Sequence, residues 1–192
     1  MFSTFLWSGV FFRITDGILV VLGGNDDRAR LADVEMLNLT ATNAVQMASQ
    51  FRLPEVVLRQ QTTIWNGTIL TCGGEPRGGK TARCDISLKG KTTKKFPSMN
   101  HKRTYFGMIT MNETVTVIGG DYHTYATVEL YDENQQIWVN KKDAPVSIYN
   151  YCILPYSTDE IILIGGHQKT GKRVIWKRTN KCPSIKFFFI NV

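Results

Sequence analysis

The sequence predicts an all-β protein made of about four repeated units, each a four-stranded antiparallel sheet. Pairs of glycines recur along the 192 residues with spacings of 50, 46 and 46 residues, and each pair follows a run rich in β-branched and aliphatic residues. No segment of ten or more residues has the spacing of apolar residues that a convincing amphipathic helix requires. The glycine pairs are Gly23-Gly24, Gly73-Gly74, Gly119-Gly120 and Gly165-Gly166.

The first two strands of each unit are predicted to form a hairpin that ends at the glycine pair. In the second unit, Asn66-Gly67 separates the extended runs TTIW and TILTC, and this dipeptide is typical of a two-residue turn. In the first unit, the apolar N-terminus MFSTFLWSGVFF supplies the first strand. That segment has no preceding Lys or Arg and no clear cleavage site, so a strand is favoured over a signal peptide.

A third strand follows each glycine pair after a polar loop of variable length. Its aligned apolar positions are Val34, Cys84, Val128 and Val174. A fourth strand is predicted at QQIWV in the third unit and at IKFFFI near the end of the chain. The chain is therefore interpreted as one domain of residues 1–192, with units at about 9–50, 57–98, 103–142 and 148–190.

The segment GEPRGGKT, which runs from Gly74 to Thr81, matches the phosphate-binding pattern G-x-x-x-x-G-K-[ST]. A phosphate-binding loop needs a helix after Lys-Thr, because the helix N-terminus helps to hold the phosphates. Here the following ARCDISL aligns with three other strands, and the fourth unit carries a similar loop, GHQKTGKR. The segment is therefore interpreted as a loop between strands, and no nucleotide or other cofactor is expected.

The four cysteines form no C-x-x-C pair, so zinc-ribbon and thioredoxin-type sites have no support. Cys72 and Cys84 fall on neighbouring antiparallel strands, where a disulfide is geometrically conceivable. Their counterparts in the other units are Leu, Ile and Val, which favours two small buried residues without a bond. Cys152 is expected in the core and Cys182 in an exposed tail.

Charge and composition restrict the partners only broadly. The net charge is +7 and the pI is near 9.3, which favours acidic partners. No apolar run is long enough to span a membrane. Three Asn-x-Ser/Thr sequons, at Asn38, Asn66 and Asn112, compare with about two expected by chance, so they are no proof of secretion. We expect a cytoplasmic location, with secretion left open.

Basic residues concentrate between Arg77 and Arg103, a segment that contains nine cationic residues and a single acid, Asp85. One interpretation is an outer edge strand protected by lysines, and the other is a contact patch for an acidic peptide. Nucleic-acid binding is not expected, since no aromatic residues interleave the charges. His101, His123 and His167 fall in loops without a further set of ligands, so no metal site is expected.

The third unit carries the pattern by which the chain resembles the kelch repeat of β-propellers: Ile118-Gly119-Gly120, then Tyr131, then Trp138, with Pro145 in the next connection. The other units depart from it: the tyrosine position holds Leu37, Ser87 and Lys177, and the tryptophan is missing. The resemblance covers about residues 9–178. It implies a kelch-type propeller of four blades, which is partial, unusually small or completed by another chain.

The resemblance implies a non-catalytic protein-interaction module, such as a substrate-recognition or actin-associated scaffold. It further implies that the loops between strands two and three, and between successive units, contact the partner. The alternatives are a propeller enzyme of epimerase or oxidase type, as in galactose oxidase, and a truncated copy without independent function. No catalytic constellation can be placed. The candidate partner contacts are Arg28, Arg30, Arg77, Lys80, Arg103, Tyr122, His123, Tyr125, His167 and Lys172.

Overall fold

All regular elements in the described part of the chain are β-strands, which confirms the all-β prediction. The computed structural model describes residues 10–14, 18–25, 30–38, 40, 45–47, 53–88, 92–121, 124, 126–144, 147–157, 160–168 and 176–177. Sheet 1 contains β1 (Val10–Ile14), β2 (Ile18–Asn25), β3 (Arg30–Asn38) and β4 (Val45–Met47). Sheet 2 contains β5 (Gln61–Trp65), β6 (Thr68–Cys72), β7 (Cys84–Leu88) and β8 (Thr92–Phe96).

Sheets 3 and 4 repeat the same order along the chain. Sheet 3 contains β9 (Gly107–Met111), β10 (Thr114–Ile118), β11 (Val128–Asp132) and β12 (Ile137–Lys141). Sheet 4 contains β14 (Cys152–Pro155), β15 (Ile161–Ile164) and β17 (Trp176–Lys177), beside a short ladder of β13 (Ile148–Tyr149) and β16 (His167–Gln168). The predicted last strand, IKFFFI, lies outside the described residues.

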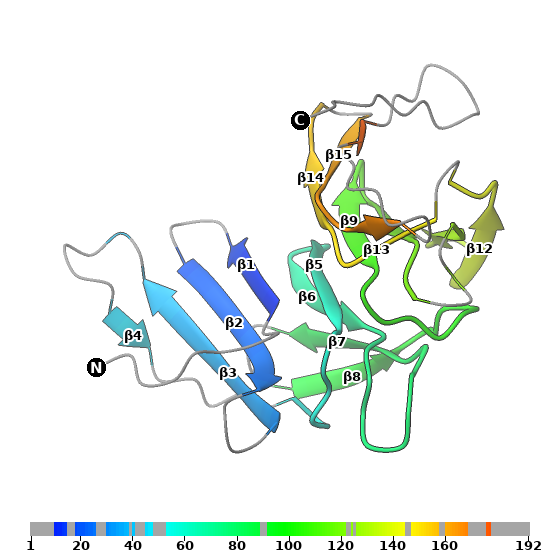
Figure 1. Ribbon diagram of the computed structural model, residues 1–192. Helices are drawn as coiled ribbons and strands as arrows, with labels where there is room; N and C mark the ends of the chain where they lie inside the picture. The colour runs from blue at the N-terminus through cyan, green and yellow to red at the C-terminus, as the bar shows by residue number, and fades with distance from the viewer. Residues whose placement is uncertain are drawn as a thin grey trace.

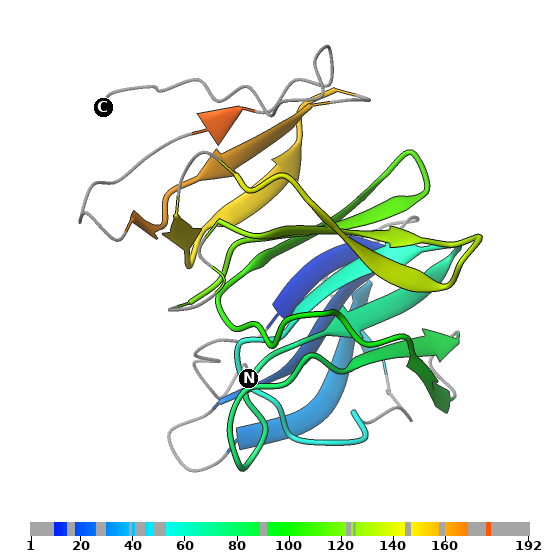
Figure 2. The ribbon, with the colours of Figure 1, turned by 90° about the vertical axis from the view of Figure 1, so that its right-hand side faces the viewer.

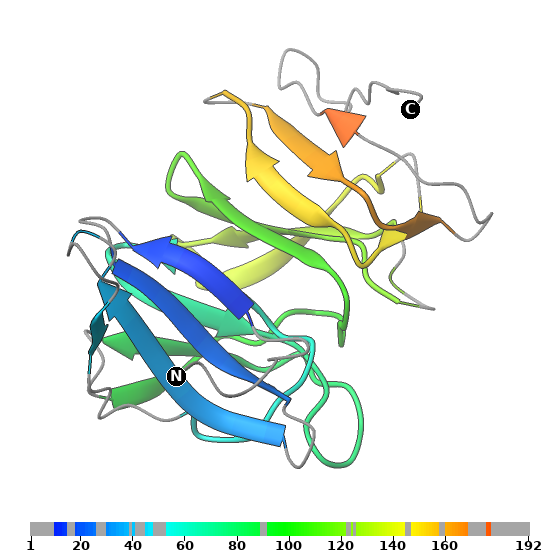
Figure 3. The same ribbon diagram turned by 60° about the vertical axis from the view of Figure 1, so that its left-hand side comes forward.

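Each sheet is an antiparallel meander in which consecutive strands pair. The first strands β1, β5, β9 and β14 lie next to one another, and the later strands of each sheet point outward (Figure 1). Sheets 1 and 4 lie at opposite ends of the array (Figures 2 and 3). Within the described residues every strand pairs inside its own unit, so no strand joins the first unit to the last.

The pleat gives every sheet two faces, which we call the leading face, toward the preceding sheet, and the trailing face, toward the following one. Alternate residues of a strand point to opposite faces. In β10, Val115 and Val117 pack with sheet 2, whereas Ile118 packs with sheet 4. The core is therefore three apolar layers, one between each pair of successive sheets.

Backbone hydrogen bonds connect neighbouring sheets at positions that repeat with the units. The amide of Gly74 donates to the carbonyl of Arg103 at 2.8 Å, and the amide of Gly120 donates to the carbonyl of Ile148 at 3.3 Å. A second set connects each linker to the residue near the start of the third strand of the unit before it. These bonds are Leu53 to Ala32 at 2.8 Å, Met99 to Ala82 at 2.9 Å and Ala144 to Ala126 at 2.7 Å.

The second glycine of a pair allows the backbone to pass close to the segment before the first strand. Gly74 has a φ of 96°, and a Cβ there would lie 2.4 Å from Val57 Cγ1 and 2.7 Å from the carbonyl oxygen of Leu58. Gly120 has a φ of 128°, and a Cβ there would lie 3.1 Å from the carbonyl oxygen of Thr104, before β9, and 2.6 Å from Thr124 Oγ1. In sheet 1 the pair Gly23-Gly24 instead lies inside β2, where the register with β3 shifts.

Candidate binding surface

The segment that matches the phosphate-binding pattern is a loop between β6 and β7, and no helix follows it. Gly78 and Gly79 adopt φ values of 108° and 114° in an exposed turn. Lys80 forms an ion pair with Asp121 of the next unit, and Arg77 is exposed. A phosphate site would need backbone amides at a helix N-terminus. The interpretation as a strand-connecting loop therefore fits the geometry.

Four residues form what we call the aromatic row, and the first of them pairs with Glu75 of this loop: Arg59, Tyr105, Tyr149 and His167. The Arg59 guanidinium lies 4.6 Å from the centre of the Tyr105 ring, a cation–π distance. The Tyr105 and Tyr149 rings meet edge to face at 6.4 Å, and the Tyr149 ring stacks on His167 at 5.5 Å. The row thus crosses units two, three and four on side chains that remain partly or fully exposed.

A left-handed backbone conformation recurs just before the first strand of sheets 2, 3 and 4, and two of the three residues that adopt it, Arg59 and Tyr105, belong to the row. Arg59, Tyr105 and Asn150 have φ values of 59°, 56° and 55°. A residue with a side chain in this left-handed region costs about 1–3 kcal/mol and persists only where neighbours impose it. Here the amide of Asn150 donates to the carbonyl of Tyr105 at 2.8 Å, which links two of these positions.

Ion pairs within the protein neutralise part of the charge around the row. Arg59 pairs with Glu75, and Lys80 pairs with Asp121. Lys80, predicted as a partner contact, is therefore already engaged, whereas Arg77 and His167 are exposed. Lys94 and Lys95 are also exposed, but they lie on β8, the outer edge strand of sheet 2, where lysines hinder pairing with other sheets.

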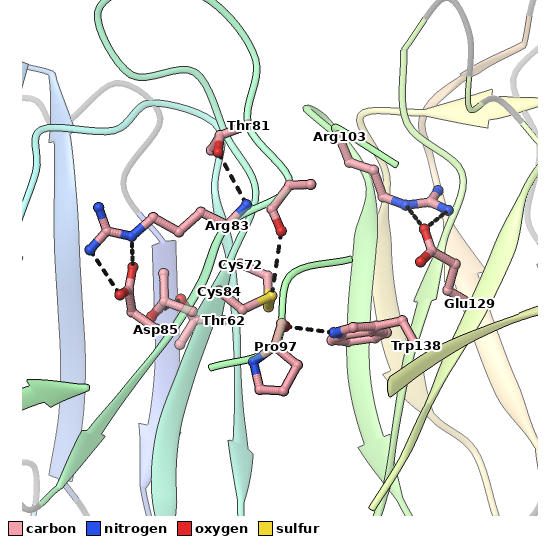
Figure 4. The surroundings of a disulfide bond; sticks show 12 residues. Thr62, Cys72, Thr81, Arg83, Cys84, Asp85, Pro97, Arg103, Glu129 and Trp138 are labelled. Atoms are coloured by element: carbon pink, nitrogen blue, oxygen red, sulfur yellow. Dashed lines mark hydrogen bonds and ion pairs between the residues drawn. A yellow bond between two sulfur atoms is a disulfide. The ribbon is translucent and has the colours of Figure 1, made fainter. Parts of the chain in front are cut away.

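Arg103 was predicted to contact a partner, and this prediction is wrong. Its side chain is fully buried between sheets 2 and 3, where Nε and Nη2 donate to Oε1 of Glu129 at 3.2 and 2.8 Å (Figure 4). Nη1 also donates to the carbonyls of Gly119 and Thr127. Burial lowers the pKa of Arg103, while the hydrogen bonds and the charge of Glu129 oppose that shift. The residue stabilises the interface between the sheets.

Cys72 and Cys84 form a disulfide with an S–S distance of 2.03 Å, which corrects the expectation of two unbridged residues. They stand directly opposite each other on β6 and β7, so their side chains lie on the same face of sheet 2 (Figure 4). Both are buried against sheet 3. Cys152, expected in the core, is an exposed free thiol, and Cys182 lies outside the described residues.

A small polar cavity of about 20 Å³ lies on the leading face of sheet 2. Among the described polar atoms at this site, the buried Nε2 of Gln60 and Oγ of Ser87 have no protein hydrogen-bond partner. The volume suffices for one water molecule. Arg83 and Asp85 line the cavity and form an ion pair. The hydrogen bond between their side chains raises the pKa of Arg83.

Several predicted contacts cannot be placed. Arg28, Tyr122, His123, Tyr125 and Lys172 lie outside the described residues, and of Arg30 only the backbone, at the start of β3, is described. Of the predicted set that is described, His167 belongs to the aromatic row, Lys80 pairs with Asp121, and Arg77 is exposed in the same loop as Lys80. Arg59, Tyr105 and Tyr149 were missed. Their one detectable signal was the 46-residue spacing of Arg59 and Tyr105, which equals two of the glycine spacings.

Comparisons with known proteins add no identification. No protein family model matches the sequence, and none of the curated proteins is significantly similar to it. Among the described residues no group of three His, Cys, Asp or Glu side chains is placed to hold a metal ion. That same part of the chain contains no helix of the length and apolarity that crossing a bilayer demands.

Proposed function

We propose that the chain is a non-catalytic protein-interaction module of kelch-type propeller architecture, and that the aromatic row binds the partner together with Arg77, which is two residues from Glu75, the ion-pair partner of Arg59. The observation that carries this proposal is the continuous contact from Arg59 through Tyr105 and Tyr149 to His167 across three units. Partly exposed aromatic and arginine side chains are the types enriched at energetically important contact positions.

The propeller architecture is supported by three features of the sheets. The first strands lie together on the inside, successive sheets pack face to face, and the linking hydrogen bonds recur at equivalent positions. Blades of a propeller stack in this way around an axis. Roles as a substrate-recognition subunit or an actin-associated scaffold derive from the kelch resemblance alone.

Chemically, the row fits an acidic peptide segment that carries an aromatic or aliphatic anchor side chain. The ring faces of Tyr105 and Tyr149 offer apolar contact, and Arg77 and His167 offer hydrogen-bond donors. The predicted cytoplasmic location stays a prediction. The Cys72–Cys84 disulfide weighs against it, because such bonds persist mainly in oxidising compartments.

Affinity capture with the intact protein tests the binding surface. We expect Arg77→Glu and Tyr105→Ala to reduce recovery of the bound partner at least tenfold, since each removes a central contact. Lys94→Glu is the matched control, because it makes the same charge change on the outer edge strand β8. Recovery that is equal for Arg77→Glu, Tyr105→Ala and the control would reject the proposed surface.

A further inference from the structure

The trailing face of sheet 4 is apolar and open. Leu154 on β14 is 45% exposed and Ile164 on β15 is 40% exposed. Ile162, two residues before Ile164 on β15, is half-buried. Leu154 pairs with Ile162 and Cys152 pairs with Ile164 across the two strands, so the four side chains share one face of the sheet.

The equivalent positions in the preceding sheets are covered. Leu70 and Cys72 on the trailing face of sheet 2 are 0% and 1% exposed beneath sheet 3. Ile109 and Ile118 on the trailing face of sheet 3 are 8% and 2% exposed beneath sheet 4. The face of sheet 4 therefore has the chemistry of a surface that a further sheet of the same repeat would cover.

What covers each trailing face is always the leading face of the next sheet. In sheet 3 that cover includes Val115 and Val117 of β10, and in sheet 4 it includes Ile161 and Leu163 of β15. In sheet 1 the corresponding register positions of β2 are Leu19 and Val21, and sheet 1 is the first sheet among the described residues. The chain thus has one apolar trailing face at one end and apolar leading positions at the other.

We propose that the trailing face of sheet 4 binds the leading face of sheet 1 of a second copy of this chain. The same contact made twice, head to tail, gives a closed dimer with two-fold symmetry. Its ring would contain twice the four sheets of one chain, which is within the range of about four to eight blades known for propellers. The proposal rests on the sheet packing and does not depend on what the aromatic row binds.

Sedimentation of the intact protein across the micromolar range tests this assembly. The expected species has the mass of two 21.8-kDa chains. Leu154→Lys and Ile164→Lys place a charge in the contact and are expected to raise the dissociation constant at least roughly tenfold. Ile137→Lys is the matched control, because Ile137 is 46% exposed on β12 of sheet 3, away from this face.

Both variants change exposed side chains, so each is expected to keep the far-ultraviolet circular dichroism of the wild type, and this spectrum confirms that the variants are folded. A monomeric wild-type protein would overturn the proposal, whether the face is covered by another part of the chain or by a different protein. So would a dimer that Leu154→Lys, Ile164→Lys and Ile137→Lys leave equally stable. Growth into open polymers would contradict the closed ring.

Discussion

At the interface between sheets 2 and 3, the leading face of sheet 3 presents Tyr131, Trp138 and the buried pair Arg103–Glu129. At the interface between sheets 1 and 2, sheet 2 has Ser87 and Thr93 at the two positions that correspond in strand register to Tyr131 and Trp138 of sheet 3. The first interface is filled, and the Trp138 indole N–H donates to the carbonyl of Pro97 at 2.8 Å. The second contains the polar cavity.

The difference shows what the tyrosine and tryptophan of the repeat contribute. A large aromatic side chain fills the space between two twisted sheets, and its polar atom bonds to the linker. Where small hydroxyl residues replace them, the sheets still stack, but buried polar groups such as Ser87 lose their protein partners. The aromatic pair therefore strengthens the interface without being required for stacking.

The largest expected effect is the loss of the buried ion pair. Arg103→Met removes the cation that pairs with the fully buried Glu129, which costs about 3–5 kcal/mol of the free energy of unfolding. Arg83→Met at the other interface removes a pair whose arginine side chain is 37% exposed, and we expect a loss of about 0–1 kcal/mol. Urea unfolding measures both variants. Equal losses would show that the two interfaces do not differ as the structure indicates.

Removal of the disulfide should have an intermediate effect. The double variant Cys72→Ala, Cys84→Ala opens a loop whose ends are 12 residues apart, and we expect a loss of about 2–4 kcal/mol. The control is Cys152→Ala, an exposed position where the change should stay within about 0.5 kcal/mol. Thermal unfolding under non-reducing conditions measures the difference, and two unaltered midpoints would mean that the bond adds no stability.

The smallest effect is expected in the polar cavity. Ser87→Ala removes a hydroxyl that has no protein partner, so the free energy of unfolding should change by no more than about 1 kcal/mol. At the equivalent position of sheet 3, Tyr131→Ala should cost about 3–5 kcal/mol, because it leaves a cavity in a filled layer. Chemical denaturation of both variants compares the two sites. A large loss at Ser87 would indicate that it makes a strong bond.

Local sequence patterns predicted the hairpins because the turn residues and the strands are adjacent in the chain. Asn66 and Gly67 have φ values of 46° and 67°, the left-handed geometry that their turn requires. The same geometry occurs at Asn112 and Glu113, with φ values of 47° and 62°. The glycine period likewise predicted where the second strand ends in sheets 2, 3 and 4, because the close approach at Gly74 is a local backbone property, whereas β2 continues through Gly23-Gly24.

The contacts between sheets were not predictable in the same way. Arg103 and Glu129 are 26 residues apart, and Tyr149 meets His167 only because β13 pairs with β16. A single sequence shows which residues are charged or aromatic, but it does not show which of them face each other across a layer. The exposed-loop prediction for Arg103 failed for this reason, and the aromatic row was missed for the same one.

The hydrogen bonds that join each linker to the preceding unit, such as Met99 to Ala82, have a consequence for how this sequence can change over time. They use backbone atoms only, so a substitution other than proline at the donor residue keeps both hydrogen-bonding groups. Among the described residues, the apolar layers lie between successive sheets, so the energetic effect of a substitution in one layer falls mainly on one interface. One unit can therefore lose its aromatic pair while the adjoining unit keeps Tyr131 and Trp138 in place.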